Sequence, residues 1–379
     1  MIIAVKIHSF YKEWVFMDKI FSIQILRGIA ALFVVCFHFR YAVNDIYAQK
    51  DIGNRLFEFG SFGVDLFFII SGFIMAMSAR KNENFSEFFI KRFFRIYPLY
   101  FVVLTLYILL SFNEYSLPQI IKSYLLVPID YKSEMPYYGY SIMAIAWTLT
   151  YEFWFYFIFG ISKKLSYKNK FIISSVLLSA PVVFVNGINI DAFHANYVLN
   201  WGVFNNIQFI TNPVVYNFIL GILSFNICVF VSKHKELLRP GLSLVLPLLL
   251  LYGVIGVVSI RGMGHGINQW GWYCFIIVTS IVISEMYFKD MYANSKMVYL
   301  GEISFSIYLI HPLLFILVNS YHPFIDVFNS LSGFTRLSCL VAFVICISHI
   351  VYRLIELPTH NLGKKIAGKI KCKRIVSVD

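Results

Sequence analysis

Charged residues are scarce in this chain, and so are the features of a modular soluble protein. Only 14% of its 379 residues are charged, whereas 59% are hydrophobic. The sequence has no Pro-, Gly- or Ser-rich linker between its apolar runs, no low-complexity tract and no internal repeat. A soluble globular domain does not have this composition. One membrane domain therefore accounts for almost the whole length.

Cysteine is also sparse, and its pattern excludes two kinds of site. Five of the six cysteines lie in apolar runs, where a free thiol acts as a small hydrophobic group. No C-x-x-C motif occurs, so the sequence predicts neither a disulfide framework nor a metal site. Residues 1–16 lack a small-residue cleavage site, which argues against a signal peptide. Met17 is an alternative initiator, and residues 1–16 would then be an extension that precedes the true start.

Apolar runs long enough to cross a bilayer recur along the sequence. We expect membrane-spanning helices at 21–41, 61–79, 96–112, 142–161, 171–187, 212–231, 241–260, 270–288, 299–319 and 335–355. The stretch 192–210 carries Asn and Gln and is expected to form a re-entrant or interfacial loop. The sequence therefore predicts an all-α integral membrane protein of about ten transmembrane helices. Its membrane domain would cover 17–360, followed by a basic cytoplasmic tail at 361–379.

The net charge of +12 follows the alternation of the loops. With the amino terminus in the cytoplasm, the loops and tail on that side contain twenty Lys and Arg residues, and the opposite loops contain six. This positive-inside bias predicts a multi-pass protein of the cytoplasmic membrane with both termini in the cytoplasm, in contact with membrane lipids. Because the basic residues are spread over five segments, we expect no nucleic-acid partner.

Arg27 and His38 both lie within residues 21–39 of the first apolar run. Arg27 and His38 are eleven residues apart, so on a helix they share one face, about 16 Å apart along the axis. Ionisable groups at membrane depth usually face a bundle interior or a water-filled cavity. Both residues could simply satisfy polar groups between helices. Alternatively, His38 is a general base, since imidazole titrates near neutral pH.

Two carboxylates are candidates for an acid–base or orienting role together with His38. Asp65 lies about one turn into the second run, at the depth expected for His38, and it either caps its helix or orients the imidazole. Glu152 lies near the middle of a run that also contains Trp147 and Tyr156. In a dry pocket Glu152 could act as a second acid or base, or could pair with Arg27.

Two further clusters complete the candidate site. Phe88, Phe89, Arg92 and Arg95 recur at helical spacing, which suits a helix lying in the membrane plane. Its arginines are either interfacial anchors or ligands for the phosphates of a cytoplasmic donor. Near the carboxyl terminus, Ser304, Tyr308 and His311 form one polar stripe. For His311, hydrogen bonding between helices and a role in catalysis are both open.

These clusters together resemble the membrane-bound acyltransferase-3 family of bacterial O-acyltransferases. The resemblance covers residues 20–358. Its motifs are Leu26-Arg27-Gly28 with His38, Gly63-Val-Asp65-Leu-Phe-Phe, Ser71-Gly72-Phe73, Lys91-Arg92-x-x-Arg95-Ile-x-Pro98, Trp147-Thr-Leu-x-x-Glu152-x-x-Phe155-Tyr156 and Ser304-Phe-Ser306-Ile-Tyr308-Leu-x-His311-Pro312.

The resemblance implies an enzyme that moves an acyl group, usually acetyl, from a coenzyme A thioester to a glycan hydroxyl. Acyl-CoA would then be a co-substrate and no cofactor would stay bound, while the acceptor would be a cell-surface glycan or a lipid-linked saccharide. It implies a location in the bacterial cytoplasmic (inner) membrane. It also marks Arg27 and His38 as essential, and Glu152, Arg92 and Arg95 as contributors.

The expected mechanism assigns a role to each candidate residue. His38 takes the proton of the acceptor hydroxyl or is itself transiently acylated, with Glu152 and Asp65 as acid–base partners. The donor phosphates are bound by the guanidinium groups of Arg27, Arg92 and Arg95. The substrate contacts and the oxyanion donor are sought among Ser71, Trp147, Tyr156, Ser306, Tyr308 and His311.

Intramembrane charges also fit a transporter or flippase of a lipid-linked saccharide. Many transporters contain inverted repeats and broken helices in matching halves, and the sequence shows neither feature. A scaffold subunit is disfavoured because it would have no use for His38 on the same face as Arg27.

Overall fold

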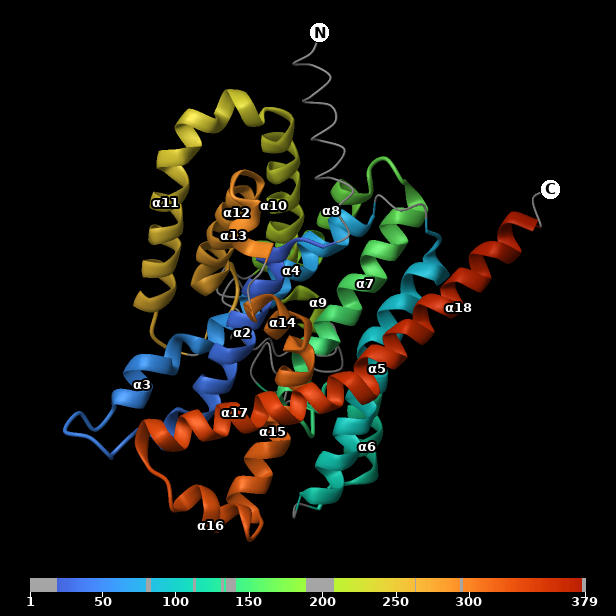
Figure 1. Cartoon of the computed structure of the whole chain (residues 1–379). Coiled ribbons are helices and arrows are strands. Elements are labelled where there is room, and N and C mark those ends of the chain that lie inside the picture. Colours follow the sequence, from blue (N-terminus) through green and yellow to red (C-terminus); the bar gives the residue numbers. More distant parts are fainter. Residues whose placement is uncertain are drawn as a thin grey trace. The chain divides into compact units, whose positions relative to one another are not determined.

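The computed structural model describes residues 19–79, 83–111, 114–130, 133, 141–188, 208–262, 264–293 and 296–376. Within these ranges the chain forms helices and no strand, which confirms the all-helical prediction (Figure 1). The proposed extension at 1–16 and most of the expected loop at 192–210 lie outside the described residues. The chain divides into two compact units, and the boundary between them falls within the first described helix.

Eight helices of the described part are long and apolar enough to cross a membrane. They correspond to eight of the ten expected spans. A ninth expected span, 299–319, is formed by two helices, Lys296–Glu302 and Ser304–Ser320, which meet at an angle of 67°. The tenth, 171–187, corresponds to an apolar helix that is shorter than the others. The protein is therefore a multi-pass membrane protein.

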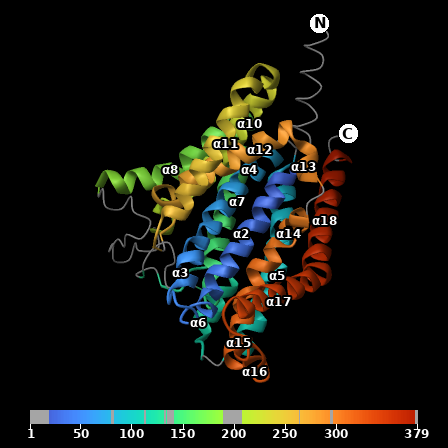
Figure 2. The same ribbon diagram turned by 60° about the vertical axis from the view of Figure 1, so that its left-hand side comes forward.

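Unit 1 contains residues 1–34, 58–80 and 214–304. Its elements are most of α2 (Phe21–Phe39), η2 (Glu58–Ser61), α4 (Phe62–Ser78), α10 (Val215–Lys233), α11 (Lys235–Ser259), η6 (Ile267–Gly271), α12 (Trp272–Tyr287), α13 (Lys289–Ala293) and α14 (Lys296–Glu302). Helices α4, α10 and α12 pack against one another, and α11 packs on α12 (Figure 2).

Glycines let the helices of unit 1 approach closely. A Cβ atom on Gly72 of α4 would overlap the carbonyl oxygen of Phe218, and one on Gly221 of α10 would overlap that of Ile69. At a second crossing, a Cβ atom on Gly301 of α14 would overlap the backbone of α2. Small residues allow such backbone contacts between membrane helices, where van der Waals packing drives association. These glycines fix how α2 and α4 are held in the unit.

Unit 2 contains residues 35–57, 81–213 and 305–379. Its elements are the end of α2, η1 (Arg40–Ala42), α3 (Ile52–Phe57), α5 (Phe85–Leu110), α6 (Leu117–Tyr124), η3 (Ala144–Ala146), α7 (Trp147–Leu165), α8 (Lys170–Ile188), α9 (Gln208–Thr211), α15 (Ser304–Ser320), α16 (Phe324–Asn329), α17 (Gly333–Val351), η7 (Tyr352–Glu356) and α18 (Leu357–Val376). Helix α5 packs on α7 and α18.

One sequence expectation changes in unit 2. The stretch around Arg92 is not a separate helix in the membrane plane, because it forms the first turns of the 26-residue α5. Asn84 caps this helix by accepting a hydrogen bond from the backbone N–H of Glu87. The basic tail is helical as well: α18 continues from η7 and lies along α5, as Figure 1 shows. Its Gly363 packs against the side chain of Phe94.

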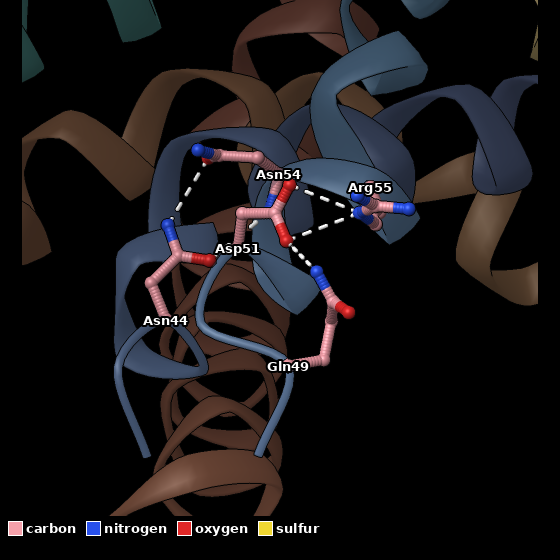
Figure 3. Close-up of polar contacts among 5 residues, drawn as sticks. All are labelled: Asn44, Gln49, Asp51, Asn54 and Arg55. Carbon is pink, nitrogen blue, oxygen red and sulfur yellow. Dashed lines mark hydrogen bonds and ion pairs between the residues drawn. The ribbon is translucent and has the colours of Figure 1, made fainter. Parts of the chain in front are cut away.

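A polar loop connects α2 to α3 in unit 2 (Figure 3). The Asn44 and Asn54 side chains bond to each other, and the backbone N–H of Asn54 donates to Asn44 Oδ1 at 3.2 Å. Asp51 accepts from Arg55 Nε at 2.9 Å and from the amide of Gln49. The hydrogen bonds from Gln49 and then Arg55 lower the pKa of the Asp51 carboxyl group. The loop that follows His38 is therefore held by local polar contacts.

Candidate active site

The helix α2 carries the residue on which the sequence argument depends. It runs unbroken from Phe21 to Phe39, so Arg27 and His38 lie on one helix, as expected. His38 is in the last turn and belongs to unit 2, whereas Arg27 belongs to unit 1. The His38 side chain is partly exposed, and its ring meets the edge of Phe37. This imidazole can therefore be reached from its surroundings.

Unit 2 brings a second imidazole to His38. The ring centroids of His38 and His311 lie 4.8 Å apart, with an angle of 36° between the ring planes. His311 comes from α15 and is only 1% exposed. Within the described residues no hydrogen bond of good geometry reaches either ring nitrogen, although the backbone carbonyls of Ile307 and Tyr308, in the preceding turn of α15, are close enough to interact with the ring. A buried polar group without a good hydrogen bond costs about 1–3 kcal/mol, so His311 is a candidate for contact with a ligand.

One turn before His311, Tyr308 ties α15 to α7. The Tyr308 and His311 ring centroids are 5.8 Å apart. The Tyr308 hydroxyl lies 3.1 Å from Thr148 Oγ1 and donates to the carbonyl oxygen of Ile145 at 3.2 Å. Thr148 donates to the same carbonyl at 2.9 Å. These contacts join α15 to α7 at the turn before His311.

Ser306 has a different partner from the one its candidate role requires. Its hydroxyl donates to the carboxylate of Glu356 at 2.5 Å, and both side chains are buried. A hydroxyl that already donates to a carboxylate has no proton to offer a reacting oxygen. In the structure Ser306 therefore joins α15 to η7.

The face of α7 that carries Thr148 continues toward the end of the helix. Thr148, Glu152 and Tyr156 follow at intervals of four residues, so they share one face over about 12 Å. The Tyr156 hydroxyl donates to the Glu152 carboxylate. The charge of Glu152 is close enough to interact with the Tyr308 hydroxyl and with Arg92. Trp147, also named from the sequence, opens α7 and meets Tyr151 edge to face.

Cations line the far end of this face. The Arg92 guanidinium lies 5.6 Å from the Tyr156 ring centroid and 5.5 Å from that of Phe88. Lys163 of α7 lies 5.8 Å from the Phe88 centroid. Arg95 is close enough to Arg92 for their charges to repel. Cations that repel each other in this way favour a polyanionic ligand beside them.

The other sequence candidates belong to unit 1. Arg27 is buried, and its guanidinium lies 3.4 Å from the side-chain oxygen of Gln24, one turn earlier on α2. Ser71 is partly exposed on α4, next to the glycine that packs on α10.

Asp65 has an imidazole partner that the sequence analysis did not name. One carboxylate oxygen lies 2.8 Å from His265 Nδ1, and the other accepts from Asn217 Nδ2 at 2.6 Å and from the backbone N–H of Gly266 at 2.7 Å. Asp65 is fully buried. Within unit 1 the loop before η6 folds back over the start of α4 and brings His265 to this carboxylate.

Comparison with known proteins fits this arrangement. Residues 20–353 match the family model described as an acyltransferase domain. The chain belongs to the acyltransferase-3 family. It is 27% identical over 314 residues to the acyltransferase MdmB of Streptomyces mycarofaciens, covering 76% of this chain and 77% of that protein. The chain is also 24% identical over 300 residues to ORF330 of Acidianus two-tailed virus, which is named as a proposed acetyltransferase. This match covers 76% of this chain and 81% of that protein. No solved structure matches.

This acyltransferase contains buried polar residues that sequence reasoning missed. His265 lies between Gly264 and Gly266, and Gly266 has a φ of +101°, a conformation that favours glycine. A histidine between glycines in a loop joining two apolar runs is a usable signal. Glu285 gave a weaker one, as an acidic residue near the end of an apolar run. Glu356 has the same signature.

The contacts of unit 2 define what the site can do chemically. A partly exposed imidazole, His38, can take a proton from a hydroxyl. The buried imidazole beside it, His311, can donate from a ring N–H to an oxygen that becomes negative. The described residues contain no group of three or more His, Cys, Asp or Glu that could hold a metal ion.

Proposed function

We propose that this acyltransferase moves an acyl group, acetyl in the first instance, from acyl-CoA to a hydroxyl of a cell-surface glycan or its lipid-linked precursor. It would do so in the bacterial cytoplasmic membrane, with both termini in the cytoplasm and about ten membrane crossings. The distribution of Lys and Arg supports this orientation. Family membership supports acyl transfer, and the residues of the site support acyl-CoA as the donor and a hydroxyl as the acceptor.

The pairing of His38 with His311 carries the proposal. Two imidazoles lie 4.8 Å apart, one partly exposed and the other buried without a hydrogen bond of good geometry, so polar contacts contribute little to the stability of this pair. A structural histidine would be expected to bond to a neighbour. The arrangement instead suits a site in which a bound substrate contacts both imidazole rings.

In the proposed reaction His38 is the general base. It removes the proton from the acceptor hydroxyl as the hydroxyl oxygen attacks the carbonyl carbon of the thioester. The N–H of His311 donates to the carbonyl oxygen while that oxygen carries negative charge. The carbon–sulfur bond then breaks, and the proton held by His38 passes to the departing sulfur. The products are the O-acylated acceptor and free coenzyme A, and His38 returns to its neutral form.

The polar face of α7 suits the approach of the donor. Arg92, Arg95 and Lys163 gather at one end of this face and would contact the phosphates of coenzyme A. Glu152 and Tyr156 lie between these cations and Thr148. The acyl-bearing arm would then extend along α7 toward the paired imidazoles. Arg27 is proposed as a further donor contact on the sequence argument alone.

Acyl transfer by purified variants tests the proposal. The protein in lipid nanodiscs is incubated with acetyl-CoA labelled in its acetyl group and with candidate glycans, and labelled glycan is measured. Replacing His38 with Ala should lower turnover by about a hundredfold or more. His311→Ala should lower kcat by about 100-fold to 1,000-fold, with partial recovery in His311→Gln, whose amide can donate.

The matched control is His322→Ala, because His322 is an exposed histidine of the same unit. It should retain full activity. Wild-type turnover by the His38→Ala variant would refute the general-base role. Uptake of a lipid-linked saccharide without any acylated product would instead support a carrier.

A further inference from the structure

An aromatic groove opens on unit 2, lined by residues of α5, by α7 and by the turn after α6. Its volume is about 390 Å³, within the size range of small-molecule sites. Five of its eight lining residues are aromatic, and Phe93 stacks on Tyr97 with ring centroids 4.8 Å apart. The groove differs in kind from the polar site, because hydrocarbon surface forms nearly all of its wall.

A turn with satisfied backbone groups forms one side of the groove. This turn, 123–126, includes the end of α6, and Leu126 has a φ of +56°. Tyr100 donates to the carbonyl of Ser123 at 2.6 Å, and Tyr97 donates to that of Tyr124 at 3.1 Å.

The third carbonyl, that of Leu126, accepts from Thr150 at 2.8 Å. Non-helical backbone at membrane depth is tolerated when its polar groups are satisfied within the protein. Tyr97 is the thirteenth of the 26 residues of α5, so the turn lies beside the middle of a candidate span. With these carbonyls and hydroxyls paired, the groove suits a ligand made of hydrocarbon.

The groove lies next to the polar face of α7. Thr150 and Phe153 of α7 line the groove, while Glu152 and Tyr156 belong to the polar face. The Phe153 ring centroid is 6.2 Å from that of Tyr156. Only the width of helix α7, about 10 Å, therefore separates a hydrocarbon chain in the groove from Glu152 and Tyr156.

We propose that this groove binds the hydrocarbon chain of a lipid-linked acceptor and so holds its saccharide near His38 and His311. The inference rests on the proposed function for the identity of the acceptor. Bulk phospholipid covers every lipid-facing helix surface. This groove, in contrast, is a single defined cavity, formed by α5, α7 and the turn 123–126, and it lies next to the polar face of α7. A lipid recognised by its chain and acylated on its sugar fits both features.

Photolabelling without turnover tests the groove. The wild-type protein in nanodiscs is mixed with a polyprenyl-diphosphate-linked sugar that carries a diazirine in its chain, and labelled peptides are mapped by mass spectrometry. A phosphatidylethanolamine with a diazirine in one acyl chain is the second probe. We expect the polyprenyl probe to label the groove peptides of α5 and α7, and excess unlabelled polyprenyl diphosphate to prevent it.

Two tryptophan variants sharpen the test. Leu125 is 67% exposed at the groove, and Leu125→Trp should fill it and reduce polyprenyl labelling about tenfold, which corresponds to the loss of contact with about two methylene groups. Leu109→Trp is the control, since Leu109 of α5 is 73% exposed and does not line the groove. It should label like the wild type.

The outcomes separate the groove from the reaction. His38→Ala should label normally, because the groove does not include His38. If the wild type labels in the groove but transfers no acyl group, the proposed chemistry is wrong and the groove proposal still holds. Equal labelling of the groove by the phospholipid probe, or polyprenyl labelling spread evenly over the lipid-facing helices, would overturn the groove proposal. Unchanged labelling in Leu125→Trp would overturn it as well.

Discussion

The hydroxyl groups of Tyr308 and Thr148 lie 3.1 Å apart and both donate to the carbonyl of Ile145, which joins α15 to α7 one turn from His311. This contact sets the position of the buried imidazole relative to the face of α7 that carries Glu152. A hydroxyl committed to a backbone carbonyl is a positioning group. Its contribution to catalysis should therefore be smaller than that of a group that touches the reacting atoms.

Replacing Tyr308 with Phe tests this assignment. The variant should lose about 1 kcal/mol of stability, the usual worth of one hydrogen bond, and its kcat should fall by less than about tenfold. Tyr321→Phe is the control, because Tyr321 also donates to a backbone carbonyl of unit 2, that of Leu110 at 2.6 Å. It should lower the melting temperature similarly without changing kcat. A loss of about a hundredfold in kcat for Tyr308→Phe would make Tyr308 an oxyanion donor.

Arg92 tests the donor end of the site. Its guanidinium lies over two rings, Phe88 and Tyr156, and a lysine would keep the charge but lose the planar fork and the stacking. We expect Arg92→Lys to raise the KM for acetyl-CoA by about tenfold or more, with a small change in kcat. Initial rates over a range of acetyl-CoA concentrations measure this.

Two comparisons show whether the effect of Arg92 arises at the phosphates. Acetyl-pantetheine lacks the nucleotide phosphates, so the wild type and Arg92→Lys should have the same KM for it. Arg336→Lys is the matched variant, because the Arg336 guanidinium lies 5.6 Å from the centroid of Tyr41 in the same unit. It should leave the KM for acetyl-CoA unchanged. An equal rise in KM for both donors in Arg92→Lys would contradict phosphate binding.

The apolar runs predicted the helices well because a bilayer imposes length and composition on any helix that crosses it. The unbroken α2 follows from this rule, as does the stripe of Tyr308 and His311 on α15. The rule does not predict where polar segments join the apolar ones. The helix through Arg92 therefore begins eleven residues before the expected start of its span at 96, and the basic tail continues as α18.

Partners from distant parts of the chain could not be predicted. Spacing within one helix tells which residues share a face, but not which other helix that face meets. His38 therefore had no assigned partner on α15, although His311 was already a candidate. The contact of Asp65 with His265 was missed for the same reason, since His265 lies 200 residues further along the chain.

The loop beyond His38 has a predictable dependence on pH. Hydrogen bonds from Gln49 and Arg55 lower the pKa of Asp51, so its ion pair contributes fully above the ordinary carboxyl pKa of about 4 and is lost as the pH falls through the lowered value. Hydrogen exchange of 44–55, corrected for intrinsic rates, should stay slow down to that ordinary pKa and increase only below it.

Asp51→Asn is the reference for this loop (Figure 3). The variant cannot form the ion pair, so its loop should exchange faster at neutral pH and show no acid step. Helix α5 of the same unit provides the internal control, because its exchange should not differ between the two proteins. Equal exchange of the loop in both proteins at pH 7 would contradict a stabilising role for Asp51.

Glu285 supplies the last prediction, because it caps the helix that carries both Arg27 and His38. Its buried carboxylate accepts from the backbone N–H groups of Phe21 at 2.9 Å and Ser22 at 2.8 Å, at the start of α2. These N–H groups have no partner within their own helix. Glu285→Ala should therefore cost about 2 kcal/mol and lower the melting temperature in detergent, while Glu285→Gln should cost less, since its amide oxygen still accepts.

The neighbouring ion pair of unit 1 provides the control for Glu285. Glu302 contacts Lys19, and both side chains are more than a third exposed: Glu302 is 35% exposed and Lys19 is 38% exposed. Glu302→Gln should therefore change stability by less than about 1 kcal/mol. If Glu302→Gln destabilised the protein as much as Glu285→Ala does, the loss would reflect charge near the start of α2 in general. A larger loss in Glu285→Ala alone identifies the two capped N–H groups as its cause.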